Sequence, residues 1–520
     1  MESLDKAAMM MKEGSVVGIR DWGYPGFLTA KEFEIFEKFR EEVFSVNRPE
    51  DFRSTVFSFS KANEEVPYAL CRWLRARKYN LEDTIKMVEE AVVCTAPARK
   101  QNFFPNPKEA LMVEKSLYIE NYPQFYFGHG KSGYPVFISQ PGKMNLDKMG
   151  CLTSVPAIID YHWYAMMHEY VAELDSMRRS NGNFKRYECI CILDLANLTP
   201  RKLGKRALDI TKAQSFIDSL CFPEILNKMI ILNAPGYFTM TWKIVRGWID
   251  ERTANKVDVI GHGKEKILRK LSNYIDPDQI PEDYGGNAQS IASFLRDDML
   301  RVADSERIVG STLELQEEDG QLVSYKGHTS KSIFVESKQT VKLSFLSRMV
   351  DGHTITVKNT KTEKVLASVV LKHDGKSDDE VDEIPTRVDL EKEAGAIVLE
   401  GPATYTVDFV SNGPRRKHMH VLMVVKTFAH EQAKTVSAPQ DADIICKSVL
   451  DQNVGSNISI CTGDFPDPQD DTELSVQASP HTERRMAIAA RKKFSTLSSQ
   501  NSSGEDYCVP EVERKTNLMC

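Results

Sequence analysis

The side chains that could do chemistry in this chain are scattered, and no nucleophile among them has a partnered base. The ten cysteines form no CxxC pair, and the sixth residue after Cys94 is Lys100, where a phosphatase loop needs an arginine. His162 and His168 share a helix face poorly at their spacing, and neither a cysteine nor a carboxylate joins them as a metal ligand. We therefore expect no enzyme, no metal site and no cofactor.

One glycine-rich stretch resembles a nucleotide-binding loop but lacks the necessary context. Gly128–Gly133 reads GxGxxG, a fingerprint that requires a following helix to meet the pyrophosphate, whereas Tyr134 begins a strand-like run. The overlapping GKS sequence lacks the first glycine of a phosphate loop, because Phe125 stands there. We predict a β-hairpin instead, which joins Gln124–Phe127 to Val136–Ser139.

Length, charge and hydropathy narrow the function classes. The chain has 520 residues and a net charge of −7, so it allows two or three domains and has no basic excess for nucleic acid. No apolar run approaches the roughly 18–20 residues of a membrane span, and the first residues do not read as a signal peptide. Cys520 is the last residue, so a prenylation signal, which needs the cysteine four from the end, is absent. Scattered cysteines predict reduced thiols in a cytoplasmic protein. Because no membrane span is predicted, we expect any membrane association to be peripheral, and Golgi and endosomal membranes are the candidates.

The elements that would position functional groups centre on a βαβ unit between Phe222 and Gly261. An apolar run over Lys228–Asn233 predicts a strand buried on both faces, and Pro235 ends it. Lys256–Ile260 predicts the next strand. The crossover helix between them carries apolar residues at spacings of three and four, namely Phe238, Trp242, Val245 and Ile249.

Other patterns predict several helices near the N-terminus, and one more strand and helix directly before this unit. Apolar spacing predicts a short helix from Lys31, and the stretch VPYALCRWLRARKYNLEDTIKMVEEAVV (66–93) predicts a helical hairpin with a cap at Asn80. Glu188–Leu195 reads as a strand and Leu208–Ile217 as the helix that follows it.

Four stretches occur in an order that resembles the CRAL-TRIO lipid-binding family, whose type member is yeast phosphatidylinositol-transfer protein. They are LRARKYNLEDTIKMVEEA, the YPQ…GYPV hairpin, PE…IILNAPGYF with W…WIDERTANKV, and IPEDYGG. The resemblance runs from about residue 68 to 286, somewhat under half of the chain. It implies an α/β fold: an N-terminal helical region, then a mainly parallel sheet around a lipid cavity with a helical gate.

The resemblance also implies a lipid headgroup site. Phosphatidylinositol binding in the family uses positions that fall here on Arg77, Glu224, Thr253 and Lys256. Cations suit the phosphate, while a carboxylate and a hydroxyl suit the inositol hydroxyls. An alternative is that these residues are ion pairs that hold the ends of the gate.

The phosphatidylcholine contacts of the family are matched poorly. One tyrosine matches Tyr126, but the positions of a second Tyr, a Ser, a Thr and an Arg hold Phe137, Cys189, Cys191 and Ile225. We therefore expect a second ligand that is not phosphatidylcholine and is more apolar. The gate lining implied by the resemblance is Phe238, Trp242, Val245 and Trp248.

After residue 300 the pattern changes to short alternating strands with Asp-Gly and Asn-Gly turns, which predicts an antiparallel β-sandwich. Its position resembles that of a GOLD (Golgi dynamics) domain, as in supernatant protein factor and patellins, with protein contact as its alternative role. Beyond it, a Ser-, Asp- and Pro-rich composition predicts a disordered tail, in which the basic segment Arg484–Ser499 is a candidate membrane contact. The predicted domains are a flexible N-terminus (1–30), a helical region (31–98), a CRAL-TRIO domain (99–300), a GOLD-like β-sandwich (301–430) and the tail (431–520).

These observations lead to one expected function and two alternatives. The expected function is to enclose phosphatidylinositol behind a gate and to exchange or present it at a membrane surface, with a second hydrophobic ligand. The first alternative is a carrier of a tocopherol, retinoid or sterol. The second is a lipid-cued scaffold in membrane trafficking that recruits a protein partner through the β-sandwich.

Overall fold

The computed structural model describes residues 6–12, 15, 17–59, 64–180, 184, 186–247, 251–297, 313–347, 352–371, 386–389, 399–412 and 419–430. Two compact units divide the chain, Met1–Glu431 and Gln432–Cys520. The predictions for the tail, for its segment Arg484–Ser499 and for Trp248 and Ile249 on the crossover helix lie outside the described residues.

The N-terminal helical region forms as its apolar spacing predicts. Helix α2 (Ala30–Phe44) begins at a capping box in which Thr29 and Glu32 satisfy each other's backbone amides. Four of its apolar residues, Phe33, Phe36, Phe39 and Val43, are buried. Helices α4 (Val66–Ala76) and α5 (Leu81–Lys100) form the predicted hairpin, and Asn80 caps α5 by accepting from the amide of Asp83 at 3.2 Å.

Part of the segment before residue 30, for which the sequence predicts a flexible N-terminus, is packed. Tyr24 and Leu28 are buried, and the Tyr24 ring lies 4.3 Å from the guanidinium carbons of both Arg75 and Arg186. These contacts join residues far apart in the chain, so local sequence pattern could not reveal them.

A five-stranded sheet forms the centre of the next region, in the order β1-β2-β3-β4-β5. Strands β1 and β2 form the predicted antiparallel hairpin, with Gln124 opposite Ser139, and every later pair is parallel. The strands are β1 (Gln124–His129), β2 (Pro135–Ser139), β3 (Cys189–Asp194), β4 (Leu226–Leu232) and β5 (Val257–Val259). The predicted strands and the parallel βαβ arrangement are confirmed.

Two neighbouring rows of side chains cross this sheet in register and point to opposite faces. The closed row ends at Asp258 and is otherwise buried: Phe125, Ile138, Ile192, Ile230 and Asp258. The open row is half-buried throughout: Tyr126, Phe137, Cys191, Met229 and Val257.

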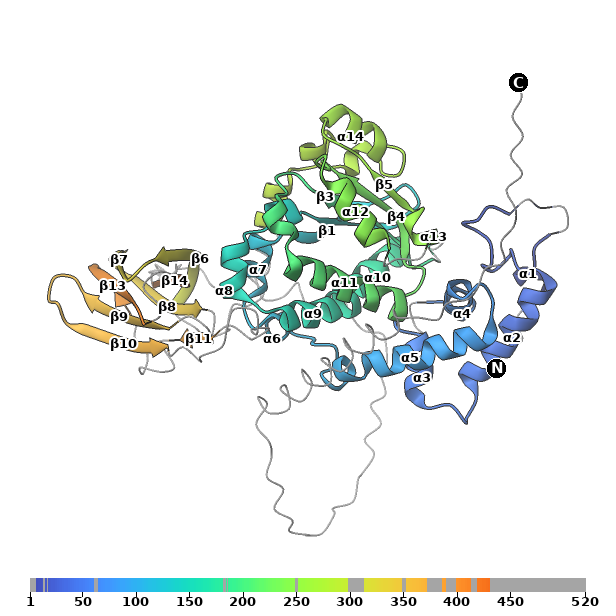
Figure 1. The fold of residues 1–520 in the computed structure, drawn as a ribbon, viewed down its shortest axis with the longest axis horizontal. Helices are drawn as coiled ribbons and strands as arrows, with labels where there is room; N and C mark the ends of the chain where they lie inside the picture. The colour runs from blue at the N-terminus through green and yellow to red at the C-terminus, as the bar shows by residue number, and fades with distance from the viewer. Residues whose placement is uncertain are drawn as a thin grey trace, which may run out of the picture. The chain divides into compact units, whose positions relative to one another are not determined.

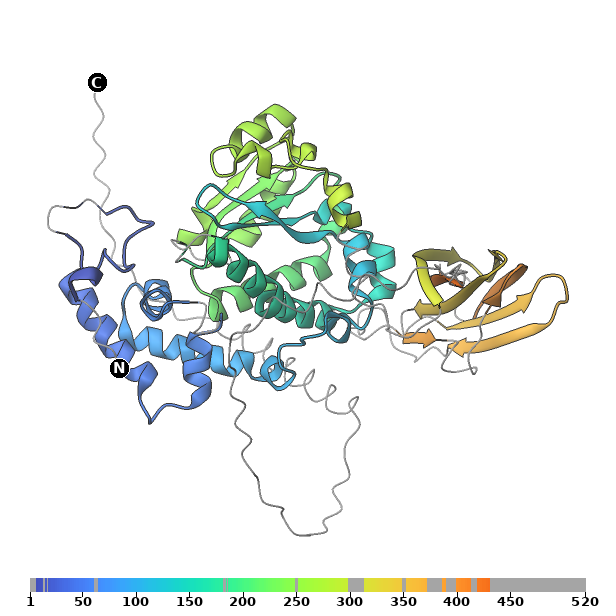
Figure 2. The ribbon, with the colours of Figure 1, turned by 180° about the vertical axis from the view of Figure 1, so that it is seen from behind.

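Helices cover both sides of the sheet. Figure 1 shows α9, α10 and α11 on one side and α14 on the other, and Figure 2 shows the same layers from behind. Helix α11 (Lys205–Cys221) is the predicted helix between β3 and β4, and α12 (Phe238–Arg246) is the described part of the crossover helix. The remaining helices are α1 (Lys6–Met9), α3 (Glu50–Val56), α6 (Pro107–Leu111), α7 (Lys115–Asn121), α8 (Leu146–Leu152), α9 (Val155–Tyr164), a π-helical turn (Ala165–Glu169), α10 (Tyr170–Ser180), α13 (Glu251–Ala254) and α14 (Lys264–Leu271), with short 3₁₀ turns η1 (Pro141–Lys143), η3 (Pro200–Leu203), η4 (Pro277–Gln279) and η5 (Glu282–Tyr284).

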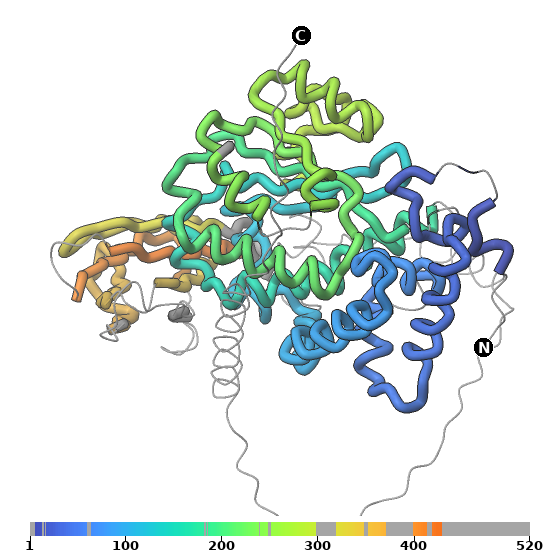
Figure 3. Tube along the Cα trace, turned by 45° about the vertical axis from the view of Figure 1, so that its right-hand side comes forward, coloured from blue at the N-terminus to red at the C-terminus, as the bar shows by residue number. Residues whose placement is uncertain are grey.

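The later strands form the predicted antiparallel β-sandwich from two sheets, coloured yellow to orange in Figure 3. One sheet has the order β10-β9-β13-β7, and the other has the order β11-β8-β14-β6 with β12 paired to β8. A shared core that includes Val335, Phe345, Val407 and Phe409 lies between them. The strands are β6 (Leu313–Tyr325), β7 (His328–Val335), β8 (Gln339–Ser347), β9 (His353–Asn359), β10 (Val365–Leu371), β11 (Thr386–Asp389), β12 (Leu399–Glu400), β13 (Ala403–Ser411) and β14 (Met419–His430).

Candidate functional site

Glu224 lies in the turn before β4 in a backbone conformation that few residues adopt. Its φ is +60°, in the left-handed region that is uncommon for residues other than glycine. The preceding turn is held by Arg72 of α4, whose Nη1 donates to the carbonyl of Pro223 at 3.0 Å. Arg72 is itself buried and fixed by two hydrogen bonds to Glu64, at 2.9 and 3.0 Å. The helical region therefore determines where the Glu224 carboxylate points.

Three cations surround the Glu224 carboxylate. Arg75 Nη2 lies 3.2 Å and Lys256 Nζ 3.4 Å from Oε2, and Arg252 Nη1 lies 3.7 Å from Oε1. Burial alone would raise the pKa of Glu224, but the charges of Lys256, Arg75 and Arg252 outweigh burial and hold this pKa below its ordinary value. The cluster therefore carries a permanent carboxylate with a net excess of positive charge.

Arg252 also ties α13, the segment after α12, to the helical region. Its Nη1 and Nη2 donate to the carbonyls of Arg75 and Ala76, at 2.8 and 3.2 Å, at the C-terminal end of α4. Cationic side chains are favourable there because the last carbonyls of a helix have no partner within it. The short helix α13 is thus anchored beside Glu224.

The four predicted headgroup residues are only partly brought together. Glu224 and Lys256 are paired, and Thr253 lies in the same turn, where its carbonyl accepts from the amide of Lys256 at 3.0 Å. Arg77 is half-buried at the C-cap of α4, where its Nη1 donates to the carbonyl of Ala76 at 3.3 Å. Arg75 and Arg77 form an Arg-Ala-Arg (RAR) motif in the stretch LRARKYN. Among the ion pairs of the described residues, Arg75 is the arginine of this motif that pairs with Glu224.

Sequence reasoning missed Arg75 and Arg252 as members of this cluster. The RAR motif offered two arginines, and only the packing of α4 decides that Arg75 points inward, with 5% of its surface exposed. Arg252 precedes Lys256 by four residues, a spacing that places two side chains on one side of a helical turn and could have suggested it.

The open row carries the predicted cavity residues. The Tyr126 ring centroid lies 5.2 Å from that of Phe137 and 6.1 Å from that of Tyr170 on α10. Burial raises the pKa of Cys191 to about 12, so its thiol stays protonated at neutral pH. The row therefore presents an apolar surface that is desolvated but not filled by close packing.

Cys189 is the first residue of β3, and Ile225 directly precedes β4. Burial, followed by the neighbouring Cys191, raises the pKa of Cys189, so it also remains a neutral thiol. Ile225 is half-buried, and its carbonyl accepts from the amide of Cys189 at 2.8 Å. Both residues thus extend the apolar surface of the open row.

Helix α12 presents two contrasting apolar faces. Phe238 is buried with Leu195, Leu198 and Ile231, and Trp242 packs against this cluster, as Met229 and Val257 of the open row do. Met240 and Ile244 point outward, with 73% and 50% of their surface exposed, whereas Val245 is half-buried. The helix therefore covers one end of the open row and offers apolar side chains to its surroundings.

The turn that leads into α12 is fixed at its beginning by a buried carboxylate. Asn233 donates to Asp194 Oδ1 at 2.8 Å, and the Tyr284 hydroxyl donates to Asp194 Oδ2 at 3.1 Å. Pro235 and Gly236 follow, and Gly236 is exposed, with open space where a Cβ would lie. This arrangement suits a hinge because a rigid strand end precedes residues with little surrounding packing.

One of the two histidines that the sequence weighed as metal ligands has a carboxylate partner. His162 Nε2 lies 2.7 Å from Asp218 Oδ1, which joins α9 to α11. Within the described part of the chain, no group of three or more His, Cys, Asp or Glu side chains could hold a metal ion. None of the helices described is both long enough and apolar enough to cross a membrane.

Residues 119–286 match the CRAL/TRIO domain. A phosphatidylinositol/phosphatidylcholine transfer protein, SFH9 of Arabidopsis thaliana, is 28% identical over 228 residues, which cover 43% of this chain and 37% of that protein. The Sec14 cytosolic factor of Schizosaccharomyces pombe is 25% identical over 267 residues, which cover 51% of this chain and 86% of that one. The match spans 34% to 39% of the length of the first three relatives, all Arabidopsis thaliana transfer proteins.

Among solved structures, Sfh5 aligns with a TM-score of 0.36 at 13% identity, over 53% of this chain and 99% of its own. The GOLD-like identity of the β-sandwich remains a prediction, as do the domain boundaries drawn from the sequence.

Proposed function

We propose that this protein binds phosphatidylinositol in a gated apolar cavity and exchanges it, or presents it, at membranes. The observation that carries the proposal is the meeting of Glu224 and Lys256, which are 32 residues apart in the chain, at 3.4 Å beside the half-buried open row. The names of the relatives, phosphatidylinositol/phosphatidylcholine transfer proteins, support the same class of ligand.

The charged cluster has the groups that an inositol phosphate headgroup requires. Lys256 and the arginines of α4 supply cations for the phosphate, while the carboxylate of Glu224 accepts hydrogen bonds from inositol hydroxyls. Thr253 would add a hydroxyl that both donates and accepts. Glu224 is already ionised and oriented by Arg75 and Arg252, so little reorganisation is needed when the headgroup arrives.

The acyl chains impose the need for a gate. Burial of each CH₂ group contributes about 0.8 kcal/mol, so two long chains in water would cost tens of kcal/mol. The open row and the inner face of α12 supply the apolar enclosure, because Trp242, Met229 and Val257 all pack against the cluster around Phe238. Met240 and Ile244 on the outer face would contact the bilayer when the helix swings about Pro235 and Gly236.

The second ligand is expected to be more apolar than phosphatidylcholine. Phe137 and Ile225 offer no hydrogen bond or charge, and the thiols of Cys189 and Cys191 are weak donors that stay neutral. A phosphocholine headgroup would lose its polar partners in this environment. Efficient transfer of labelled phosphatidylcholine between vesicles would contradict this expectation.

The test is mass spectrometry of the lipids that co-purify with the full chain. We expect phosphatidylinositol to be enriched over its share of cell lipid and to fall by roughly tenfold in Lys256→Ala, because one charge-assisted contact is lost. Lys364→Ala, an exposed lysine of the β-sandwich, is the matched control and should retain the lipid. Equal phosphatidylinositol in both variants would overturn the headgroup assignment.

The apolar replacements also favour a second candidate, a carrier of a sterol, tocopherol or retinoid. In that case the same extraction would yield the small hydrophobic molecule without phosphatidylinositol. Lys256→Ala would then change its content little, because such a ligand has no phosphate for the charged cluster to bind.

A further inference from the structure

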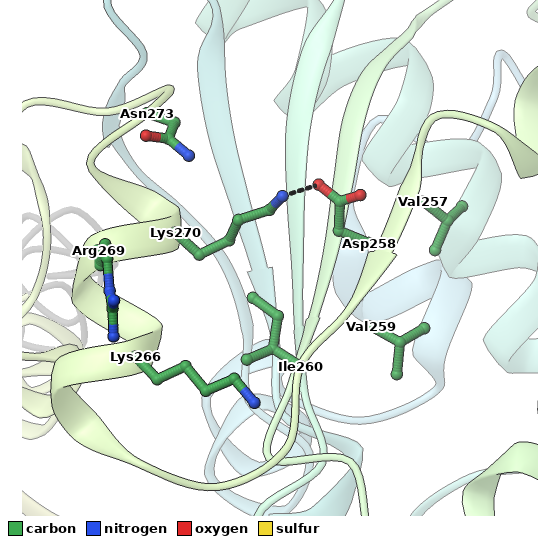
Figure 4. A pocket seen from close by; sticks show the side chains of 8 residues that line it. All are labelled: Val257, Asp258, Val259, Ile260, Lys266, Arg269, Lys270 and Asn273. Atoms are coloured by element: carbon green, nitrogen blue, oxygen red, sulfur yellow. Dashed lines mark ion pairs between the residues drawn. The ribbon is translucent and has the colours of Figure 1, made fainter.

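A groove of about 460 Å³ lies between the edge strand β5 and helix α14, apart from the Glu224 cluster. Figure 4 shows its side chains: Lys266, Arg269, Lys270 and Asn273 come from α14 and the turn after it, and Asp258 comes from the strand. A volume of this size falls in the usual range of ligand sites, roughly 300–1,000 Å³.

Asp258 organises two of the cations. Lys270 Nζ lies 2.8 Å and Lys228 Nζ 2.9 Å from the same oxygen, Oδ2. Burial alone would raise the pKa of Asp258, but hydrogen bonds from Lys270 and Lys228 outweigh burial and lower this pKa. The carboxylate thus stays charged and holds both lysines, which together exceed its charge by one.

Two further cations have no such partner. Lys266 and Arg269 are exposed, and within the described residues no ion pair or hydrogen bond of their side chains is recorded. Because they are three residues apart, they lie on the same face of α14. Among the residues that line the groove, three cations against one carboxylate give an excess of two positive charges.

The strand adds backbone donors to this surface. The carbonyl of Lys256 accepts from Met229 at 3.0 Å, and the amide of Ile260 donates to Ile231 at 2.8 Å. Val257 and Val259 alternate with these residues, so their amides point to the outer edge, where β5 is the last strand of the sheet. Hydrogen-bond donors from the backbone and from a guanidinium group together suit a phosphate ligand, which has more acceptor oxygens than a carboxylate ligand.

We propose that this β5–α14 groove is a second anion site, for a ligand that bears phosphate. An excess of two charges is what one or two phosphate groups would neutralise. The fork of Arg269 can bind one phosphate with two parallel hydrogen bonds, while Lys266 and Lys270 act as point charges on another. Such a ligand could be a membrane-borne headgroup or a free polyphosphate.

The test measures binding of the full chain to two probes. Calorimetry with soluble inositol trisphosphate reports the free ligand, and sedimentation with phosphatidylcholine vesicles, with and without phosphatidylinositol bisphosphate, reports the headgroup. We expect Lys266→Ala/Arg269→Ala to weaken binding by roughly tenfold or more, because two charge-assisted contacts are lost. Both residues are exposed, so the variant should fold, and an unchanged unfolding midpoint checks this.

The matched control is Lys361→Ala/Lys364→Ala, which removes two exposed lysines three residues apart from the β-sandwich. Binding to both probes with similar affinity, lost only in the groove variant, supports a site for free and membrane-borne phosphates. Binding to vesicles alone assigns the site to a headgroup in a membrane, and binding to the soluble probe alone assigns it to a free ligand. Binding to neither probe, or equal loss in the control, overturns the proposal.

The groove is also testable independently of the proposed lipid transfer. Lys256→Ala should lose phosphatidylinositol from the cavity but keep its affinity for soluble inositol trisphosphate. The converse result for Lys266→Ala/Arg269→Ala, with cavity lipid retained and trisphosphate binding lost, would show that the two sites are separate.

Discussion

The closed and open rows of the same sheet differ in what lies against them. Ile138, Ile192 and Ile230 of the closed row have at most 1% of their surface exposed. Phe137, Cys191 and Met229, their direct neighbours along the same strands, are all half-buried. Both rows are mainly apolar, so hydrophobicity alone does not separate a buried row from a half-buried one.

This difference indicates what each row contributes. In a close-packed core every side chain is in contact on all sides, and removed atoms leave a cavity. The half-buried side chains of the open row have surface that a bound acyl chain could cover. The closed row should therefore determine stability, and the open row should determine ligand content.

The largest expected effect tests the closed row. Ile192→Ala should lower the free energy of unfolding by about 2–5 kcal/mol, because the side chain is 1% exposed and its loss leaves a cavity. Met229→Ala, its counterpart in the open row, should cost clearly less. Urea unfolding of the lipid-free protein measures both, and equal losses would break the distinction between the rows.

A smaller effect is expected when the open row is filled. Cys191→Phe adds volume beside Phe137 and Met229, so we expect co-purified lipid to fall several-fold while stability changes by less than about 1.5 kcal/mol. Lipid phosphorus per protein gives the first value and urea unfolding the second. Unchanged lipid together with a large loss of stability would mean that this row is ordinary core.

The smallest effect concerns the charged cluster at the edge of the open row. The folded-state pKa of Glu224 lies below its ordinary value of 4.5, so the unfolded state takes up the proton first as the pH falls. The stabilisation is therefore fully present above about pH 4.5 and is lost as the pH drops through the folded-state pKa.

Glu224→Gln should remove this part of the acid sensitivity, because the amide does not titrate in that range. Unfolding midpoints measured from neutral to acidic pH provide the check. If the wild type and the variant lost stability in parallel below pH 4.5, Glu224 would not be the responsible group.

The sequence by itself determined the elements that depend on local pattern. The apolar spacing of Phe33, Phe36, Phe39 and Val43 was enough for α2, and the run before Pro235 was enough for β4, because periodicity and helix breakers act over a few residues. The turn signals after residue 300 likewise predicted an antiparallel β-sandwich. The order of the quoted motifs indicated the CRAL-TRIO resemblance.

Only the tertiary structure decided which charged groups meet. Arg75 reaches Glu224 while Arg77 caps α4, a choice made by the packing of Tyr24 and by the turn that Arg72 holds. The tertiary structure also decided that the closed row is buried while the neighbouring open row is half-buried. It likewise placed Lys266 and Arg269 beside β5. These outcomes depend on contacts between distant segments, and the direction of a side chain in such contacts is not encoded in any local spacing.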